Sequence, residues 1–262
     1  MRLAVIPARG GSKRIPRKNI LPFAGRPMLA YAIAGARAAG VFDRIIVSTD
    51  DAEIARIALD HGAEVPFVRP AALADDHAST VAVIAHALRT LAEAGWPASQ
   101  VCCIYPGVPL LDAADLRAGL ALLDAGDCDY VLPVAAFAAP VQRALLRDAD
   151  GQTRAMHPEY TESRSQDLTP AYHDAGQFYW GRAEAWLAGR HPHQHARSLL
   201  LPSWRVVDID TPDDWARAER LHAAAAAAAA AARPSGWALA QAAAPAATKP
   251  AVQRTAPALA GG

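Results

Sequence analysis

Residues 3–19 read LAVIPARGGSKRIPRKN, and this stretch decides the fold. It begins with the apolar run Leu3–Ile6, which predicts a buried strand, and passes directly into a polar loop with two adjacent glycines. Further along, apolar runs rich in β-branched residues alternate with stretches whose apolar side chains recur at helical spacing. Strands of this kind, separated by helices, are typical of a parallel sheet covered on both faces. We therefore predict an α/β fold with a Rossmann-like, mainly parallel sheet and helices on both faces.

The expected elements follow one another along residues 1–222, which we predict to form one domain. Helices are expected at 27–39, 51–61, 79–94 and 113–123, and strands at 3–6, 45–47, 64–68, 101–105, 130–134, 177–180 and 205–207. The stretch at about 140–170 is polar and lacks long apolar runs. We interpret it as a small inserted arm rather than another strand–helix unit.

The C-terminal residues 223–262 differ in composition from the rest of the chain. They begin with an uninterrupted alanine run at 223–232, which favours an extension of the last helix until Pro234-Ser235-Gly236 stops it. The remainder is rich in Ala and Pro and holds too little large apolar surface to order itself, so we expect a flexible tail.

Charge and cysteine content exclude several classes of protein. The 262 residues carry 26 basic and 26 acidic side chains, so the basic excess of a nucleic-acid binder is absent. The formal net charge is −3 for residues 1–222, called the body below, and +3 for the tail at 223–262. No apolar run approaches the roughly 20 residues of a membrane span, and no signal-peptide core is present. Three cysteines, two of them adjacent, do not suggest a disulfide framework, so we expect a cytoplasmic protein.

The loop that follows the first predicted strand is expected to bind a polyphosphate. In open α/β sheets, ligands bind beyond the carboxyl ends of the strands. Gly10-Gly11 allows close approach of the backbone N–H groups to an anion. Five cations lie within ten residues, and two of the three lysines of the chain are among them: Arg9, Lys13, Arg14, Arg17 and Lys18. The alternative is a solvated basic loop, and the spacing matches neither a Walker A motif nor a dinucleotide fingerprint.

A second candidate site is the sequence Asp208-Ile209-Asp210 near the end of the body. On an extended backbone the two carboxylates face the same side. Together with nucleotide phosphate oxygens they would suit Mg²⁺. The alternative is a pair of helix-start residues, a role that we assign to Asp213 and Asp214, which follow Thr211 and Pro212.

The loop at residues 7–19, called the phosphate loop below, resembles the signature of a known family. A strand followed by Pro-Ala-Arg-Gly-Gly-Ser-Lys, and then by Lys18-Asn19, is similar to the motif of cytidylyltransferases that make CMP-activated nine-carbon acidic sugars, among them CMP-sialic acid synthetases. The resemblance covers about residues 1–222. The segments 13–20, 166–167 and 172–180 are closer to the branch that acts on pseudaminic acid.

The resemblance implies a reaction in which CTP and a 2-keto sugar acid give the CMP-sugar and pyrophosphate. It implies a phosphate cradle made by Arg9, Gly10, Gly11, Ser12 and Lys13, with Lys18 and Asn19 near the α-phosphate. It also implies that Arg69 and Ser79 contact the cytosine and ribose, although Ser79 could equally be a plain N-cap. Asp208 and Asp210 would bind the catalytic Mg²⁺, and the residues expected to be catalytic are Lys18, Arg9 and Asp210.

The sugar contacts are carried over from the same family with one departure. Tyr105 stands where sialic acid synthetases have Gln, and Pro106-Gly107 departs from the pattern of the pseudaminic branch. An acidic sugar needs a cation for its carboxylate. In related enzymes the arm supports a homodimer and can reach the neighbouring site. The candidate sugar-binding residues are therefore Tyr105, Arg143, Arg164, Gln166, Tyr172, His173 and Asp174. His173 could act as a general base, but an ordinary surface histidine is the default interpretation.

Three further questions stay open at the level of sequence. The triplet His191-x-His193-x-His195 could line a strand and bind Zn²⁺, but Pro192 favours a loop. Sialic acid, legionaminic acid or the eight-carbon acid of lipopolysaccharide could replace pseudaminic acid as substrate. A non-catalytic nucleotide-binding module could also keep the phosphate loop, although it would have little need for Asp208 and Asp210.

Overall fold

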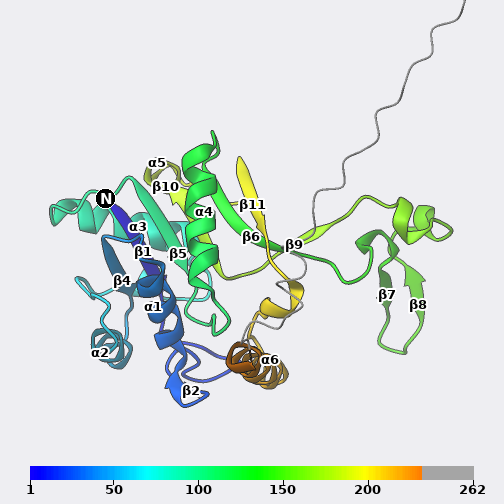
Figure 1. Ribbon diagram of the computed structural model, residues 1–262, viewed down its shortest axis with the longest axis horizontal. Coiled ribbons are helices and arrows are strands. Elements are labelled where there is room, and N and C mark those ends of the chain that lie inside the picture. The colour runs from blue at the N-terminus through cyan, green and yellow to red at the C-terminus, as the bar shows by residue number, and fades with distance from the viewer. Residues whose placement is uncertain (232–262) are drawn as a thin grey trace, which may run out of the picture. The chain divides into compact units, whose positions relative to one another are not determined.

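A seven-stranded sheet organises the chain in the computed structural model, which describes residues 1–231. Its order is β11-β6-β10-β5-β1-β4, with β9 added against β6 (Figure 1). The strands are β1 (Arg2–Pro7), β4 (Arg44–Ser48), β5 (Gln100–Ile104), β6 (Tyr130–Ala136), β9 (Tyr172–Asp174), β10 (Phe178–Arg182) and β11 (Ala196–Leu200). Strand β1 pairs in parallel with β4 and β5, and β11 with β6, whereas β10 and β9 run antiparallel to their neighbours. The mainly parallel α/β sheet is as predicted.

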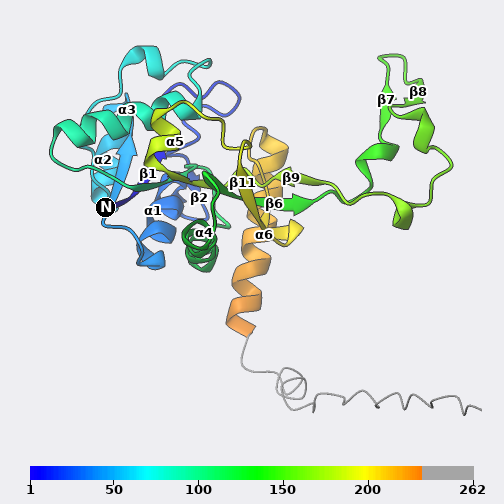
Figure 2. The same cartoon turned by 90° about the horizontal axis from the view of Figure 1, so that it is seen from above.

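Helices cover both faces of this sheet (Figures 1 and 2). Alternate residues of β1 point to opposite faces, as a strand requires. Ala4 and Ile6 pack with apolar residues of α1 (Met28–Ala39), α2 (Ala52–Asp60) and α4 (Ala113–Ala125). Leu3 and Val5 pack instead with α3 (Thr80–Glu93) and α5 (Ala183–Leu187). The core therefore consists of two apolar layers that sandwich the sheet.

Two of the predicted strands are wrong. Residues 64–68 form only isolated bridges, Ile46 to Glu64 and Thr49 to Val68, because Pro66 between them has no N–H to donate to a ladder. Residues 205–207 are not a strand either: Ser203–Arg205 is a 3-10 turn and coil follows it. The apolar Val206 is buried against Ala135 and Leu201 in a small cluster, which explains the misleading pattern. The place beside β6 is taken by β11, which the sequence analysis missed.

The segment between β6 and β9 adds no strand to the main sheet. It contains the hairpin β7 (Leu145–Arg147) and β8 (Thr153–Ala155) and the short 3-10 turns Val141–Arg143, Pro158–Tyr160 and Ser165–Asp167. Both views show the hairpin well away from the sheet (Figures 1 and 2). A second small hairpin, β2 (Pro22–Phe23) with β3 (Arg26–Pro27), precedes α1, and the turn Ala71–Leu73 precedes α3.

The last described element is α6 (Pro212–Ala231), which runs into the alanine-rich stretch. Met1–Ala223 forms one compact unit. Most of the expected flexible tail, residues 232–262, lies outside the described residues. Among residues 1–231 no helix is both long and apolar enough to cross a membrane. All three cysteines, Cys102, Cys103 and Cys128, are buried free thiols.

Candidate active site

A cavity of about 810 Å³ opens at the carboxyl ends of β1 and β5. Pro7 at the end of β1 and Tyr105 just after β5 lie in its wall, together with the loop that follows β1. Ten of the residues predicted from the sequence line it: Arg9, Ser12, Lys13, Lys18, Asn19, Arg69, Tyr105, Asp174, Asp208 and Asp210. The fold thus brings residues from the start, the middle and the end of the body to one place.

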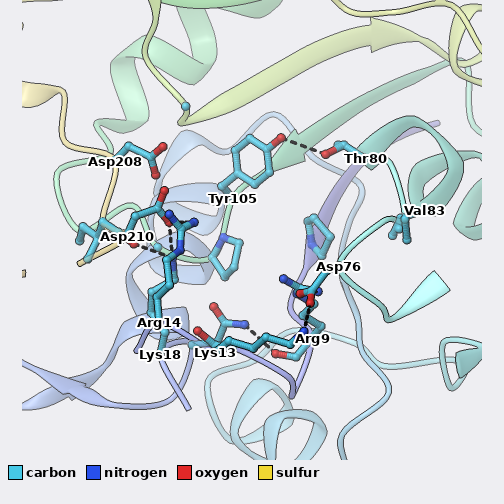
Figure 3. A pocket seen from close by; sticks show the side chains of 18 of the residues that line it. Arg9, Lys13, Arg14, Lys18, Asp76, Thr80, Val83, Tyr105, Asp208 and Asp210 are labelled. Carbon is cyan, nitrogen blue, oxygen red and sulfur yellow. Dashed lines mark hydrogen bonds and ion pairs between the residues drawn. The ribbon is translucent and has the colours of Figure 1, made fainter. Parts of the chain in front are cut away.

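One pair of loop cations faces an acid that the sequence analysis did not single out. Arg9 Nη1 lies 2.6 Å from Asp76 Oδ1, and the Lys13 ammonium pairs with the other oxygen of the same carboxylate (Figure 3). These two cations hold the pKa of Asp76 below its usual value. Lys13 is largely exposed at the cavity mouth. Two cations thus share one carboxylate, which leaves the group with one formal net positive charge at the cavity mouth.

Four of the five loop cations line the cavity, and the fifth, Arg17, does not. Arg17 adopts a left-handed backbone conformation, with φ of 57°. Its guanidinium pairs outside the cavity with Asp51, 2.5 Å away, and with Glu53. Asp51 is also the N-cap of α2, accepting from the N–H groups of Glu53 and Ile54. Arg17 therefore anchors the loop to α2 rather than facing the cavity.

Gly10 and Gly11 shape the loop without lining the cavity. The N–H of Gly10 donates to Asp50 Oδ1 at 3.1 Å. A Cβ at Gly10 would lie 2.7 Å from Asp51 Oδ2, whereas one at Gly11 would meet nothing within 4 Å. The close approach of the loop backbone to Asp51 therefore requires glycine at position 10 but not at position 11. Asn19 is buried and donates from Nδ2 to the carbonyl of Arg9 at 2.9 Å, so it braces the loop from behind.

A second charged group joins the loop to the segment after β11. Lys18 Nζ donates to the carbonyl of Ile209 at 2.5 Å and lies 3.4 Å from Asp210 Oδ1. Arg14 Nη2 lies 2.7 Å from the same Asp210 oxygen, as Figure 3 shows. Partial desolvation and the charge of Asp210 raise the pKa of Asp208. The carboxylates thus converge on the loop cations, although they come from coil and not from the end of a strand.

An apolar cluster also holds the loop after β1 against the segment that contains Asp208 and Asp210. Ile15 of the loop and Ile209, which separates the two acids, are both buried in one cluster. Phe23, Met28 and Ala218 complete it, and Trp215 of α6 packs against it. The cluster holds the loop and the acidic segment together independently of their charges.

Arg69 and Ser79 have different surroundings. Arg69 lines the cavity and is only 4% exposed. Its Nε donates to Ser48 Oγ at 3.1 Å, and burial lowers its pKa to about 10, so it remains a cation at neutral pH. Ser79 does not line the cavity, because its hydroxyl caps α3 by accepting from the N–H of Ala82. The neighbouring Thr80 lines the cavity in its place.

Another part of the cavity wall includes the hydroxyl groups of Thr80, Tyr105 and Tyr179 and the carboxylate of Asp174. Tyr105 and Thr80 share a hydrogen bond of 2.9 Å between their hydroxyls. The rings of Tyr105 and Tyr179 pack edge to face, with centroids 5.7 Å apart. Burial raises the pKa of Tyr105 to about 12, so its hydroxyl stays protonated at neutral pH. Tyr179 in turn donates to Asp174 Oδ2 at 2.6 Å.

Five of the predicted sugar-binding residues do not line this cavity. Arg143 and Gln166 are exposed on the segment between β6 and β9, and the exposed Arg164 there pairs with Asp167 at 2.8 Å. Tyr172 is half exposed on β9. His173 packs edge to face on Phe137, and its Nδ1 lies 2.9 Å from the carbonyl oxygen of Asp174. Within a single chain, these residues are separate from the phosphate loop.

The histidine triplet lies in a loop, as the proline between its first two members indicated. No group of three or more His, Cys, Asp or Glu side chains suited to a metal ion occurs within residues 1–231. His193 contacts Asp174, and His195 Nδ1 lies 3.5 Å from Asp129 Oδ2. The arrangement gives no support to the zinc alternative.

The cavity was only partly readable from the sequence. Missing from the prediction were Asp76, Thr80 and Tyr179, and Arg14 was counted only as a loop cation. The adjacent acids Asp75-Asp76 before a helix N-terminus could have drawn attention to that segment. Thr80 and Tyr179 carry no such signal, because a helix-start threonine and a strand tyrosine are ordinary in those positions.

Fold and cavity together define a class: an α/β protein whose glycine-containing loop after β1 shares one cavity with a pair of carboxylates that its cations contact. A family model described as cytidylyltransferase matches residues 3–192. The chain belongs to this cytidylyltransferase family, whose members are CTP-dependent nucleotidyltransferases.

Individual relatives agree with this assignment. A pseudaminic acid cytidylyltransferase of Campylobacter jejuni is 42% identical over 221 residues, which are 84% of this chain and 95% of the relative. The CMP-N,N'-diacetyllegionaminic acid synthase of Legionella pneumophila is 31% identical over 84% of this chain and 95% of its own length. Among solved structures, a CMP:2-keto-3-deoxy-manno-octonic acid synthetase superposes with a TM-score of 0.63 at 17% identity, over 85% of this chain and 98% of that one. This likeness supports the fold.

Proposed function

We propose that this cytidylyltransferase transfers CMP from CTP to the anomeric hydroxyl of a nine-carbon 2-keto sugar acid, pseudaminic acid, with release of pyrophosphate. The observation that carries the proposal is the meeting of Lys18 with the Asp208–Asp210 segment in one cavity. Phosphate-binding cations and metal-binding carboxylates are the two elements that transfer of a nucleotidyl group requires. The choice of pseudaminic acid rests on the identity of 42% to the Campylobacter enzyme, against 31% to the legionaminic relative.

The phosphate loop would bind and orient the triphosphate. Arg9 and Lys13 would exchange their contact with Asp76 for contacts with the β- and γ-phosphates, and Ser12 lies in the same wall. Lys18 would lie by the α-phosphate, where negative charge moves toward the departing pyrophosphate. The sugar hydroxyl would attack the α-phosphorus in line, so correct placement of the two substrates accounts for much of the acceleration.

Asp208 and Asp210 fit a divalent cation. Both line the cavity, and the pKa of Asp208 is raised first by partial burial and then by the charge of Asp210, a repulsion that a cation would offset. Oxygen ligands from two carboxylates, completed by phosphate oxygens and water, suit Mg²⁺. The ion would neutralise phosphate charge during transfer. Asp210 would give up its contacts with Arg14 and Lys18, which frees both cations for phosphate oxygens.

The nucleoside and the sugar would occupy the remaining walls. Arg69 has no carboxylate within ion-pair distance among the described residues, so it can offer its guanidinium to the cytosine or ribose. Tyr105 and Asp174 would contact the sugar. Arg143, Arg164 and Gln166, on the arm, would contact a sugar in another chain's cavity, whereas Tyr172 and His173 lie beside Asp174 on β9 without lining the cavity.

We propose further that residues 1–222 are the catalytic domain and that the arm at 140–170 serves a homodimer. Exposed apolar side chains on and beside the arm support this: Leu145, Met156 and Tyr160 are 65%, 44% and 37% exposed. Sedimentation of the full chain tests it, with a dimer expected and a monomer at all concentrations contradicting it. The cytoplasmic location expected from the cysteine pattern stays a prediction.

The decisive experiment measures pyrophosphate release by the purified chain. We expect release only when CTP, Mg²⁺ and a nine-carbon keto acid are present together, fastest with pseudaminic acid. The panel includes legionaminic acid, N-acetylneuraminic acid and the eight-carbon acid, so that the acceptor is ranked. Faster turnover of another acid would overturn the choice of acceptor. No release with any of them would overturn the enzymatic proposal and leave a nucleotide-binding module.

A further inference from the structure

The carboxylate of Asp174 lines the cavity wall and pairs with no lysine or arginine among the described residues, its one charged contact being His193. Its Oδ2 accepts hydrogen bonds from Tyr179 at 2.6 Å and from His193 Nε2 at 2.7 Å. Its Oδ1 accepts the N–H of Gly176 at 2.8 Å. The side chain is 23% exposed and lines the cavity. Three donors from three segments thus hold one carboxylate in a fixed orientation.

The number of acceptor positions on this group is limited. A carboxylate offers about four lone-pair sites to donors. Three are occupied, both sites of Oδ2 and one of Oδ1. The remaining site belongs to Oδ1, which leaves Asp174 able to accept one more hydrogen bond from a group that enters the cavity.

His193 comes to Asp174 from the loop between α5 and β11. This loop is tied down beyond His193 as well: the N–H of His193 donates to His191 Nδ1 at 3.2 Å, and the Asp129 N–H donates to the carbonyl of His195 at 2.9 Å. The His193 ring is 52% exposed and contacts Asp174 from the outer side, while Tyr179 contacts it from the sheet. The histidine triplet thus orders a loop that holds a cavity residue.

We propose that His193 is a positioning residue for the sugar: it fixes Asp174 so that the free acceptor of Oδ1 receives an N–H or O–H donor of the sugar acid. This proposal rests on the proposed function and deepens it. A carboxylate repels the acid group of the sugar and disfavours acceptors, so this part of the cavity selects a donor substituent, such as a hydroxyl or an acylamino N–H. Sites built to bind a substrate donor reject analogues that lack it.

The test compares three variants of the full chain: His193→Ala, His193→Gln and Gln194→Ala. The glutamine can still donate from an amide nitrogen. Gln194 is the matched control, since its exposed side chain makes no hydrogen bond within residues 1–231. We expect His193→Ala to raise the KM for the sugar acid by about five- to tenfold, since it removes a hydrogen bond to a charged group. The KM for CTP should be unchanged, the glutamine should restore most of the loss, and Gln194→Ala should match the parent enzyme.

A second readout separates positioning from general damage. The parent enzyme is given the preferred sugar acid and a deoxy analogue that lacks a single hydroxyl or acylamino donor. Both enzymes are assayed, and the ratio is kcat/KM for the preferred sugar acid divided by kcat/KM for the analogue. When the analogue lacks the donor that Asp174 binds, this ratio should be smaller in His193→Ala than in the parent. Equal rises in the KM for CTP and for sugar, or ratios unchanged for every donor tested, would overturn the proposal. If the parent enzyme itself turns over no sugar acid, the proposed function fails instead. His193→Gln keeps the test available if the alanine variant does not fold.

Discussion

The two ends of the cavity are built on different principles. At the end that we propose binds phosphate, called the phosphate end, long cationic side chains on the loop after β1 pair with Asp76 and Asp210 from elsewhere in the chain. At the end that we propose binds the sugar, called the sugar end, the hydroxyl of Tyr105 hydrogen-bonds with Thr80 of α3, and that of Tyr179 with Asp174. Coulombic attraction weakens slowly with distance, whereas a hydrogen bond needs defined lengths and angles. We therefore expect the phosphate end to supply rate and the sugar end to supply selectivity.

The largest effect should follow from Lys18→Ala. The variant loses the cation that we propose lies beside the reacting phosphate, and kcat for pyrophosphate release should fall by about 10²–10³-fold. The KM for the sugar acid should change little, because the proposed contacts that bind the sugar are made by Tyr105 and Asp174 and not by Lys18. Arg56→Ala is the control, since Arg56 is exposed, pairs only with Asp60 on the same helix and does not line the cavity. A loss of less than tenfold in Lys18→Ala would remove the distinction between a rate-supplying and a selecting end.

A second prediction concerns the two glycines of the phosphate loop. Gly10→Ala forces a Cβ against Asp51 and should lower the free energy of unfolding by about 1–3 kcal/mol, the usual cost of overpacking. Gly11→Ala meets open space and should stay within about 0.5 kcal/mol of the parent. Urea unfolding of both variants measures this difference. Equal losses would mean that the loop does not pack against the start of α2 as described.

The third prediction tests the hydroxyl pair of the sugar end with the variant Tyr105→Phe. It removes the hydroxyl that bonds Thr80, a loss of about 1 kcal/mol or roughly fivefold in affinity. This should appear in the KM for the sugar acid and not in that for CTP. Thr80→Val removes the partner, and the double variant should lose less than the two single losses combined. Strict additivity would show that the two hydroxyls act separately.

The smallest effect should be the acid sensitivity of the loop anchor. Hydrogen bonds from Arg17 hold the pKa of Asp51 below its usual value of 3.8. A lowered carboxyl pKa stabilises the fold above the unfolded-state value, and this contribution is lost as the pH falls through the folded-state value. Asp51→Asn keeps an N-cap of similar strength but loses the ion pair with Arg17, so it should be less stable than the parent near pH 7 by up to about 1 kcal/mol. The gap should narrow as the pH falls below 3.8. Thermal melts across this range measure it, and a gap independent of pH would contradict the ion pair.

The sequence predicted the phosphate end far better than the sugar end, for a physical reason. The loop is one contiguous stretch after a buried strand, so its glycines, cations and position can be read together. The Asp208–Asp210 pair was also readable, although the strand assigned before it was wrong because Val206 packs into a core cluster from coil. At the sugar end, Thr80, Tyr179 and His193 come from separate segments, and each has an ordinary local role. Only the folded sheet brings them together.

The apolar cluster beneath the charged groups has a consequence for the order in which the protein matures. Lys18 and the Ile209 carbonyl that it binds are 191 residues apart in the chain. Ile15 stays without its cluster partners Ile209 and Ala218 until α6 has docked. During synthesis, a chain that has already made β1 and the phosphate loop still lacks the acidic half of its site. The site is therefore completed last, so a truncated or unfinished chain would have the loop cations but not the two carboxylates that we propose work with them.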